Sequence, residues 1–181
     1  MTPTDDEQAM GLALEQATLA DRAGEVPVGA VVVQADPLAP TGWRVVGVGH
    51  NQPLGAHDPT AHAEIVALRQ AAERLGNYRL PDCELFVTLE PCAMCAMATL
   101  HARLRRVVFA AQDPKTGAAG SVVDLYAHRG LNHQTHVQGG VLADPCGELL
   151  RAFFARRRAE QRLARSDAPA EMPGPTTPGS A

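Results

Sequence analysis

Two cysteines and one histidine carry the strongest chemical signal in the sequence. Cys92 and Cys95 lie three positions apart in the segment PCAMC, in a chain that has only four cysteines. His62 lies earlier, in the stretch TAHAE. Catalytic zinc sites typically use three protein ligands of these types and leave a fourth position for water. Two thiolates and an imidazole therefore predict a catalytic zinc site made of His62, Cys92 and Cys95.

Glu64 follows His62 by two positions. Residues two apart on a helix do not share a face, so the carboxylate is not expected to bind the same ion as His62. In the first turn of a helix, however, it can flank the ion and reach a water bound there. A carboxylate so placed accepts the proton of the water and later passes it to a substrate. The spacing thus predicts Glu64 as a proton shuttle.

A Cys-x-x-Cys pair has other uses, and these alternatives remain open at this point. A thioredoxin-like redox pair has the same spacing, in which case His62 and Glu64 would be coincidental. A structural zinc site would need a fourth ligand. The residues that could supply it are Cys83, His101, His133 and Cys146. Of these, Cys83 and Cys146 are expected in the core, where cysteine packs as a small apolar side chain.

Helical and strand-like patterns alternate along the chain. Apolar spacing and turn residues predict helices over 5–23, 58–76 and 90–102, and a last helix from near Asp144 through the arginines; they predict strands over 26–34, 44–49, 84–89, 105–111 and 136–142. For the second helix, Asp58 or Thr60 is the expected cap, with Pro59 in the first turn. Strands separated by helices indicate an α/β sheet covered by helices.

The chain length of 181 residues fits one domain, which we place at residues 1–165. Residues 166–181 are rich in proline and glycine and are predicted to be a disordered tail. No stretch approaches the roughly 20 apolar residues of a membrane-spanning helix, so no membrane partner is expected. The N-terminus is acidic and lacks the pattern of a secretory signal, which predicts a cytoplasmic protein.

The net charge of −4 argues against a nucleic-acid partner, but the distribution of charge argues the other way. Residues 151–165 contain six arginines and one glutamate. Such a stripe can bind phosphate, although an arginine-rich helix end is often only a solvated face. Phe153 and Phe154 lie in the same segment, and aromatic side chains beside arginines suit single-stranded RNA.

Several separate motifs agree, in order, with one family. The pair H-x-E and P-C-x-x-C is the signature of zinc nucleobase deaminases. The segments GEVPVGAV, HDPTAHAEI, NYRL, VTLEPC, RVVFAAQDPKTGAAGS and LNH extend the likeness over roughly residues 8 to 160. The chain resembles the bacterial tRNA-specific adenosine deaminases, within the cytidine and deoxycytidylate deaminase superfamily.

This resemblance implies a cytidine-deaminase-like fold, a three-layer α/β/α sandwich around a five-stranded mixed sheet. It implies a homodimer with one Zn²⁺ per subunit. It also implies the hydrolytic deamination of adenosine to inosine at the wobble position of a tRNA anticodon stem-loop. In that reaction zinc-activated hydroxide attacks C6 of the base, and Glu64 moves the protons.

The resemblance also assigns roles to individual residues. His62, Cys92 and Cys95 match the zinc ligands. Asn51 is implied to hydrogen-bond the flipped nucleoside, and Val28 to wall its pocket. The residues that match RNA-contacting positions are Asp113, Lys115, Asn132 and His133 in loops, and Phe154, Arg157 and Arg158, with Phe153, near the end of the chain.

The chain departs from the family pattern at three places. Gln52 stands where the family often has arginine, the connector 34–43 is long, and Ala155 and Arg156 alter the basic pattern of the last helix. Two rival functions remain. A deaminase of free bases or nucleotides would need neither the arginine-rich helix nor the segment DPKTGAAGS. A non-catalytic, zinc-braced RNA-binding module would not need Glu64.

Overall fold

The computed structural model describes residues 2–166, so the predicted tail lies outside the described residues except for Ser166, which is the last residue of a helix. In chain order the elements are α1 (Pro3–Arg22), β1 (Gly29–Ala35), β2 (Trp43–His50), α2 (Pro53–Ala56), α3 (Ala63–Leu75), β3 (Cys83–Leu89), α4 (Ala93–His101), β4 (Arg106–Ala111), β5 (His136–Gly139) and α5 (Ala143–Ser166).

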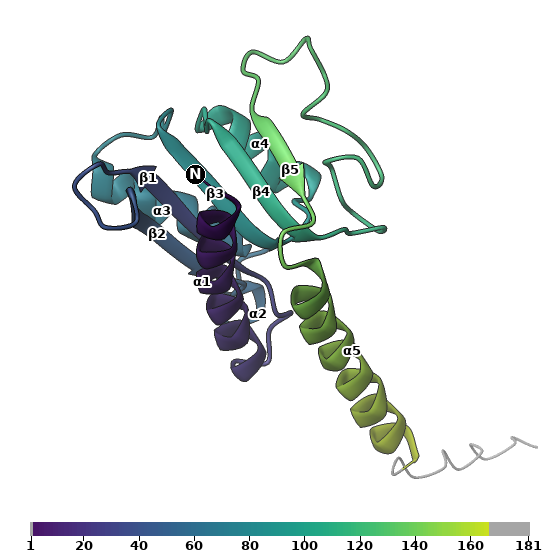
Figure 1. Cartoon of the computed structure of the whole chain (residues 1–181). Helices are drawn as coiled ribbons and strands as arrows, with labels where there is room; N and C mark the ends of the chain where they lie inside the picture. The colour runs from purple at the N-terminus through teal and green to yellow at the C-terminus, as the bar shows by residue number, and fades with distance from the viewer. Residues whose placement is uncertain (1, 167–181) are drawn as a thin grey trace, which may run out of the picture.

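The five strands form one mixed sheet in the order β2-β1-β3-β4-β5 (Figure 1). Strand β1 is antiparallel to both of its neighbours, whereas β3, β4 and β5 are parallel to one another. Strands β2 and β3 therefore run in the same direction on either side of β1. The predicted five-stranded mixed sheet is confirmed.

Helices cover both faces of the sheet and make two separate layers of core. On one face α1 packs with Met10 and Ala13 against Val31, Phe86 and Val108, and Cys146 of α5 joins this cluster. On the other face α3 and α4 bury the alternate side chains of the same strands; the members include Val32, Ala67, Leu85, Ala96 and Val107. Alternation of side chains along each strand gives the α/β/α sandwich that the sequence predicts.

Two predicted boundaries shift for local reasons. Helix α1 begins at Pro3, earlier than expected, because Thr2 and Asp5 cap each other's backbone in a capping box. Strand β1 begins only at Gly29 and not at residue 26. The amide of Val28 donates to the carbonyl of Val26 at 2.8 Å, which closes a tight turn around Pro27 before the strand.

The predicted helix 58–76 is wrong at its start. Asp58 caps a turn, with its Oδ1 accepting from the backbone amide of Thr60 at 2.7 Å, and α3 begins only at Ala63. Residues 90–92 likewise lie outside the helix, and α4 begins at Ala93. In both places the structure puts a predicted metal ligand, His62 or Cys92, at the N-cap position of the helix.

Helix α3 lies unusually close to β2. A Cβ on Gly49 would be 2.3 Å from the backbone oxygen of Ala63, and one on Gly47 would be 2.3 Å from that of Ala67. Only glycine permits this approach, so these two positions set the height of α3, and therefore of His62, over the sheet. Within residues 2–166, no helix combines the length and the apolar character needed to span a membrane.

Candidate metal centre and active site

The topology brings the starts of α3 and α4 together. Because β2 and β3 run in the same direction, the chain leaves both strands at the same end of the sheet. Helices α3 and α4 then both return over the same face. Their first residues therefore face each other across the beginning of β1. We call this end of the sheet the carboxyl end of β3.

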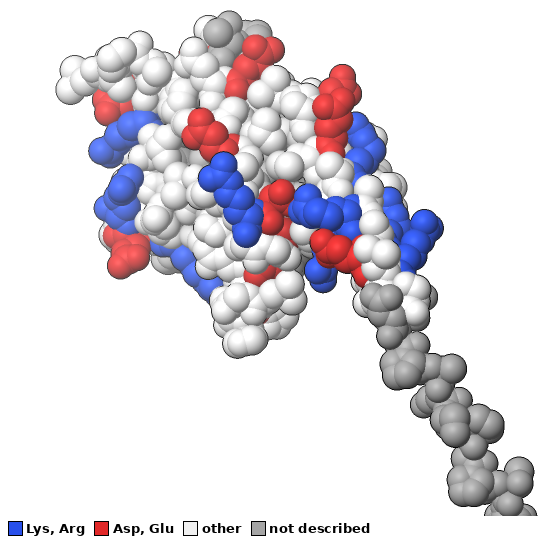
Figure 2. All heavy atoms as spheres, turned by 90° about the horizontal axis from the view of Figure 1, so that it is seen from below, with Lys and Arg blue, Asp and Glu red and all other residues white. Residues whose placement is uncertain are grey.

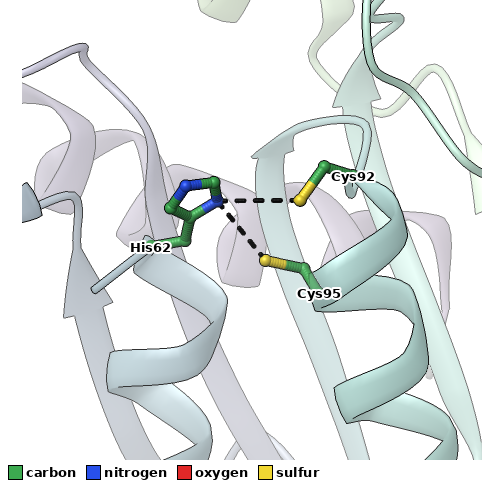
Figure 3. Close-up of side chains that lie close together, drawn as sticks. All are labelled: His62, Cys92 and Cys95. Atoms are coloured by element: carbon green, nitrogen blue, oxygen red, sulfur yellow. Dashed lines mark hydrogen bonds between the residues drawn. The ribbon is translucent and has the colours of Figure 1, made fainter. Parts of the chain in front are cut away.

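The three predicted zinc ligands converge at the carboxyl end of β3 (Figure 3). The Nδ1 atom of His62 lies 3.7 Å from Sγ of Cys92 and 3.5 Å from Sγ of Cys95. Neither His62 nor Cys92 uses its side chain to cap its helix, so both are free to turn toward a common point. A tetrahedral site with ordinary Zn–N and Zn–S bonds separates N and S ligand atoms by about 3.6 Å. The donor set and its spacing fit a zinc ion.

One of the three side chains, Cys92, is already in its metal-binding form. The neighbouring Cys95 and His62 groups lower the pKa of the Cys92 thiol to about 4, so Cys92 is a thiolate at neutral pH. The pKa of His62 is raised by its contact with Cys92. The pKa of Cys95 is raised, by its contact with Cys92 and by burial. A divalent cation at this point would remove that proton, since coordination deprotonates thiols.

Glu64 lies in the first turn of α3 and is only 4% exposed. Burial raises the pKa of its carboxyl to about 7, an effect to which the charge of Cys92 adds. None of the seven ion pairs among the described residues involves Glu64. A buried carboxyl with a pKa near neutrality can both accept and donate a proton, as general acid–base catalysis requires.

Asn51 and Val28 also lie at the carboxyl end of β3, and a backbone hydrogen bond joins them. The amide of Asn51 donates to the carbonyl of Val28 at 3.0 Å, and both side chains are buried. Asn51 Oδ1 accepts from the amide of Ala63 at 2.9 Å, at the start of α3. This bond fixes the side chain and leaves its –NH₂ group as the donor available to a ligand.

Residues predicted to contact RNA fall into two groups. Asp113, Lys115, Phe154 and Arg158 line one cleft between α5 and the loop after β4. Asn132 and His133 line a different hollow, together with Met97 and His101 of α4. Arg157 is in neither group; its guanidinium lies 3.4 Å from the carboxylate of Glu160 on the same helix.

The alternative of a structural zinc site finds no support. Among residues 2–166, no fourth His, Cys, Asp or Glu joins the triangle of His62, Cys92 and Cys95. Cys83 and Cys146 are buried in the two core clusters, and burial raises the pKa of both thiols to about 11. His133 Nε2 lies 3.0 Å from the carbonyl of Leu104 instead.

Sequence reasoning missed two polar anchors near the site. Glu90, just before the Pro91–Cys92 pair, is 3% exposed and accepts hydrogen bonds from the loop after β4. Tyr126 Oη lies 2.9 Å from Thr99 Oγ1 of α4, with both residues buried. The only signal in the sequence was the presence of a carboxylate next to a buried strand.

Residues 3–111 match the cytidine and deoxycytidylate deaminase zinc-binding region. The chain is 46% identical to a tRNA-specific adenosine deaminase of Haemophilus influenzae, over 89% of this chain and 90% of that protein. Among solved structures it resembles a tRNA:A34 deaminase described as performing A-to-I editing at the wobble position. That structure has a TM-score of 0.73 and 43% identity, and the match covers 79% of this chain and 99% of that one.

A guanine deaminase from Nitrosomonas europaea is also similar, with a TM-score of 0.68 and 28% identity over 82% of this chain and 84% of that one. The chain is therefore less identical in sequence to the guanine deaminase than to the two tRNA deaminases. The triangle of His62, Cys92 and Cys95 lies within the segment that matches the zinc-binding region of the family. The chain therefore belongs to the zinc-binding cytidine and deoxycytidylate deaminase family, and within it to the tRNA-specific adenosine deaminases.

Proposed function

We propose that this protein converts adenosine to inosine at the wobble position of a tRNA anticodon. The observation that carries the proposal is the triangle of His62, Cys92 and Cys95 with the buried carboxyl of Glu64 two residues from His62. The similarity to proteins named tRNA-specific adenosine deaminases directs this chemistry to adenosine in tRNA.

The reaction adds water to the base and releases ammonia. A C6–O bond forms, the C6–N bond breaks, and two protons move from the water to the base and the leaving amine. Zinc, when bound by His62, Cys92 and Cys95, supplies the Lewis acidity that makes water a nucleophile at neutral pH. Glu64 accepts the proton of the attacking water, delivers it to N1 and then assists protonation of the departing amine.

The base must leave its stack to reach this site, because C6 is inaccessible in a stacked loop. Asn51 is held by its bond to Ala63 and points its –NH₂ group as a fixed donor for the flipped nucleoside. Val28, 5% exposed, supplies an apolar wall. A donor that is fixed before binding costs little ordering free energy when the ligand arrives.

The RNA around the target is proposed to lie over α5 and the loops. Phe154 is 44% exposed and offers a stacking face, and Arg158 and Lys115 line the same cleft and offer charge to phosphates. Figure 2 shows acidic and basic groups intermixed on one face, with basic side chains gathered close to where the described part of α5 ends. Asp113, Asn132, His133 and Arg157 remain proposed contacts.

We include a homodimer with one zinc ion per subunit in the proposal. Tyr78 is 66% exposed and borders the hollow that also contains Met97 and Leu100 of α4. An exposed aromatic side chain beside apolar helix residues suits a second copy of the chain. A cytoplasmic location is part of the same proposal. Sedimentation of the zinc-loaded protein tests the dimer.

The test of function uses an anticodon stem-loop with adenosine at the wobble position. We expect the zinc-loaded protein to form inosine, and Glu64→Gln to lower kcat by roughly 10²–10⁴-fold, the usual range for loss of an acid–base group. Zinc content should stay the same. Glu84→Gln is the matched control, since it alters an equally buried carboxylate outside the site; its kcat should equal that of the wild type.

Two outcomes would redirect the assignment. Release of ammonia from free guanine or cytidine, with the stem-loop unedited, would make the protein a deaminase of small molecules. RNA binding without any turnover, equal in the wild type and Glu64→Gln, would make it a zinc-braced binding module.

A further inference from the structure

Glu90 is a buried carboxylate whose hydrogen bonds all go to one loop. Its Oε2 accepts from the backbone amide of Asp113 at 3.0 Å and from the hydroxyl of Ser121. Its Oε1 accepts from the amides of Ala119 and Ser121 at 2.9 and 3.1 Å. These donors lie between Asp113 and Ser121, in the segment 112–121, which we call the 112–121 loop. One side chain thus closes a loop that has no strand or helix of its own.

The loop is also shaped around this carboxylate. A Cβ on Gly117 would lie 2.4 Å from Cδ of Glu90, so any other residue there would displace the carboxylate or the loop. The amide of Ala118 donates to the carbonyl of Pro91 at 2.8 Å, and Gly117 pairs with Cys92 in an isolated bridge. The 112–121 loop is therefore fastened to the residues that lead into the zinc ligands.

A carboxylate suits this place better than a neutral group. All four groups that face Glu90 are donors, and an ionised carboxylate accepts at both oxygens without presenting a hydrogen. An amide of the same shape would point an –NH₂ group at some of these donors. That arrangement would leave partly buried N–H groups of the loop without an acceptor.

Resting on the proposed function, we propose that Glu90 is a positioning residue that holds the 112–121 loop ready for RNA. The loop carries Asp113 and Lys115, which line the same cleft as Phe154 and Arg158. Glu90 forms no hydrogen bond to a zinc ligand and does not itself line the cleft, so it acts on the cleft through the amide of Asp113 and the rest of the loop. Without it, the loop must be ordered when RNA binds, which weakens binding but leaves the chemical step intact.

The test compares Glu90→Gln with the wild type on the zinc-loaded, full chain. We expect KM for the anticodon stem-loop to rise about tenfold while kcat changes less than about threefold, because only binding of the loop to RNA is impaired. Hydrogen exchange at the amides of Asp113, Ala119 and Ser121 should become faster. Direct binding of the stem-loop, measured in a Glu64→Gln background that does not turn over, should weaken by the same factor as KM.

Glu84→Gln serves as the matched control, because Glu84 is equally buried but bonds to arginines away from this loop. It should leave KM and the exchange of the 112–121 loop unchanged. If Glu90→Gln does not fold or loses zinc, Ser121→Ala takes its place. Removing that one hydroxyl should raise KM about threefold and speed exchange of the loop.

The results separate this inference from the proposed function. Absence of inosine with the wild-type protein would overturn the function itself, whereas the exchange measurement would still report whether Glu90 holds the loop. Inosine formation with an unchanged KM in the variant tested would overturn the positioning role alone. Equal losses of kcat and of zinc in Glu90→Gln, with Ser121→Ala behaving as wild type, would also overturn it and leave Glu90 a structural residue.

Discussion

The two ends of strand β3 both carry buried carboxylates, but they treat the charge in opposite ways. At the amino end, Glu84 and Asp6 share the guanidinium of Arg106, which bonds both oxygens of Asp6 at 2.9 and 2.5 Å and Glu84 at 3.1 Å. At the carboxyl end, Glu64 and Glu90 are as deeply buried, yet neither forms an ion pair among residues 2–166.

The difference separates residues that hold the fold from residues that serve the reaction. A buried charge is tolerated when a partner neutralises it, as Arg106 does. A carboxyl that must exchange protons cannot be locked in that way, and burial of Glu64 keeps the pKa of its carboxyl near 7. Glu90 is intermediate, because neutral backbone donors hold it in place of a cation.

Removing a zinc ligand should abolish activity at the carboxyl end of β3 without affecting the ion cluster at its amino end. We expect Cys95→Ala to lose bound zinc and to reduce inosine formation to the level of chelator-treated protein, since three ligands are the minimum in such sites. Metal analysis and a stem-loop assay measure both effects. Cys146→Ala, which removes a thiol of similar burial from the other face, should retain zinc and activity. Normal zinc content in Cys95→Ala would remove this residue from the site.

Breaking the ion cluster at the amino end should cost stability and leave catalysis intact. Arg106→Ala leaves Asp6 buried without a cation and leaves Glu84 with only Arg105 as its partner, and removing one partner of a buried ion pair typically costs about 3–5 kcal/mol. Urea unfolding of the zinc-loaded protein measures the loss, and kcat at 25 °C should stay within about twofold of wild type. A loss below about 1 kcal/mol would show that the cluster is not important for the fold.

Some of this contrast follows from the sequence and some does not. His62, Cys92, Cys95 and Glu64 can be predicted because each lies within a short motif whose spacing determines what the side chains reach. Glu90 cannot, because its donors at Asp113, Ala119 and Ser121 are brought to it only by the folded loop. The starts of α3 and α4 were missed for a local reason: polar turns compete with the helix at Asp58, and Pro91 precedes the helix instead of opening it.

The existence of each strand is easier to predict from the sequence than the residues at which the strands and helices begin and end. Apolar runs, rich in valine in the interior strands, predict every strand of the sheet, although β5 is limited to His136–Gly139 and the short α2 is not predicted. The RNA-contact residues stay predictions, since only contact with RNA tests them. Arg156, which departs from the family pattern, turns out to bond Asp21 of α1 at 2.5 Å and to lie over the ring of Phe153.

A neutral anchor at the carboxyl end should be worth less than the ion cluster. Thr99 Oγ1 donates to the carbonyl of Ala96 at 2.7 Å, so Tyr126 must be the donor in the bond between the two hydroxyls. Tyr126→Phe removes that bond alone and should lower the free energy of unfolding by about 1 kcal/mol. A double-mutant cycle with Thr99→Val measures the coupling. No coupling would mean that the pair does not fasten the loop to α4.

The exposed ion pair between α5 and α1 should be worth least. The side chain of Arg156 is 47% exposed, and pairs at such sites contribute about 0.2–1 kcal/mol. We expect Arg156→Ala to lower stability by no more than this, and 1 M salt to abolish the difference because it screens exposed charges. A larger loss that persists in salt would point to the packing of Arg156 on Phe153.

The placement of α1 has a practical consequence for experiments on this protein. Asp6 bonds to Arg106, the first residue of β4, and so joins the first turns of α1 to the amino end of that strand. The start of α1 therefore lies at the end of the sheet opposite to the zinc ligands (Figure 1). A fluorophore or a surface tether joined ahead of α1 therefore leaves the cleft beside α5 unobstructed. Single-molecule or immobilised assays of RNA binding can be built from that side without redesigning the site.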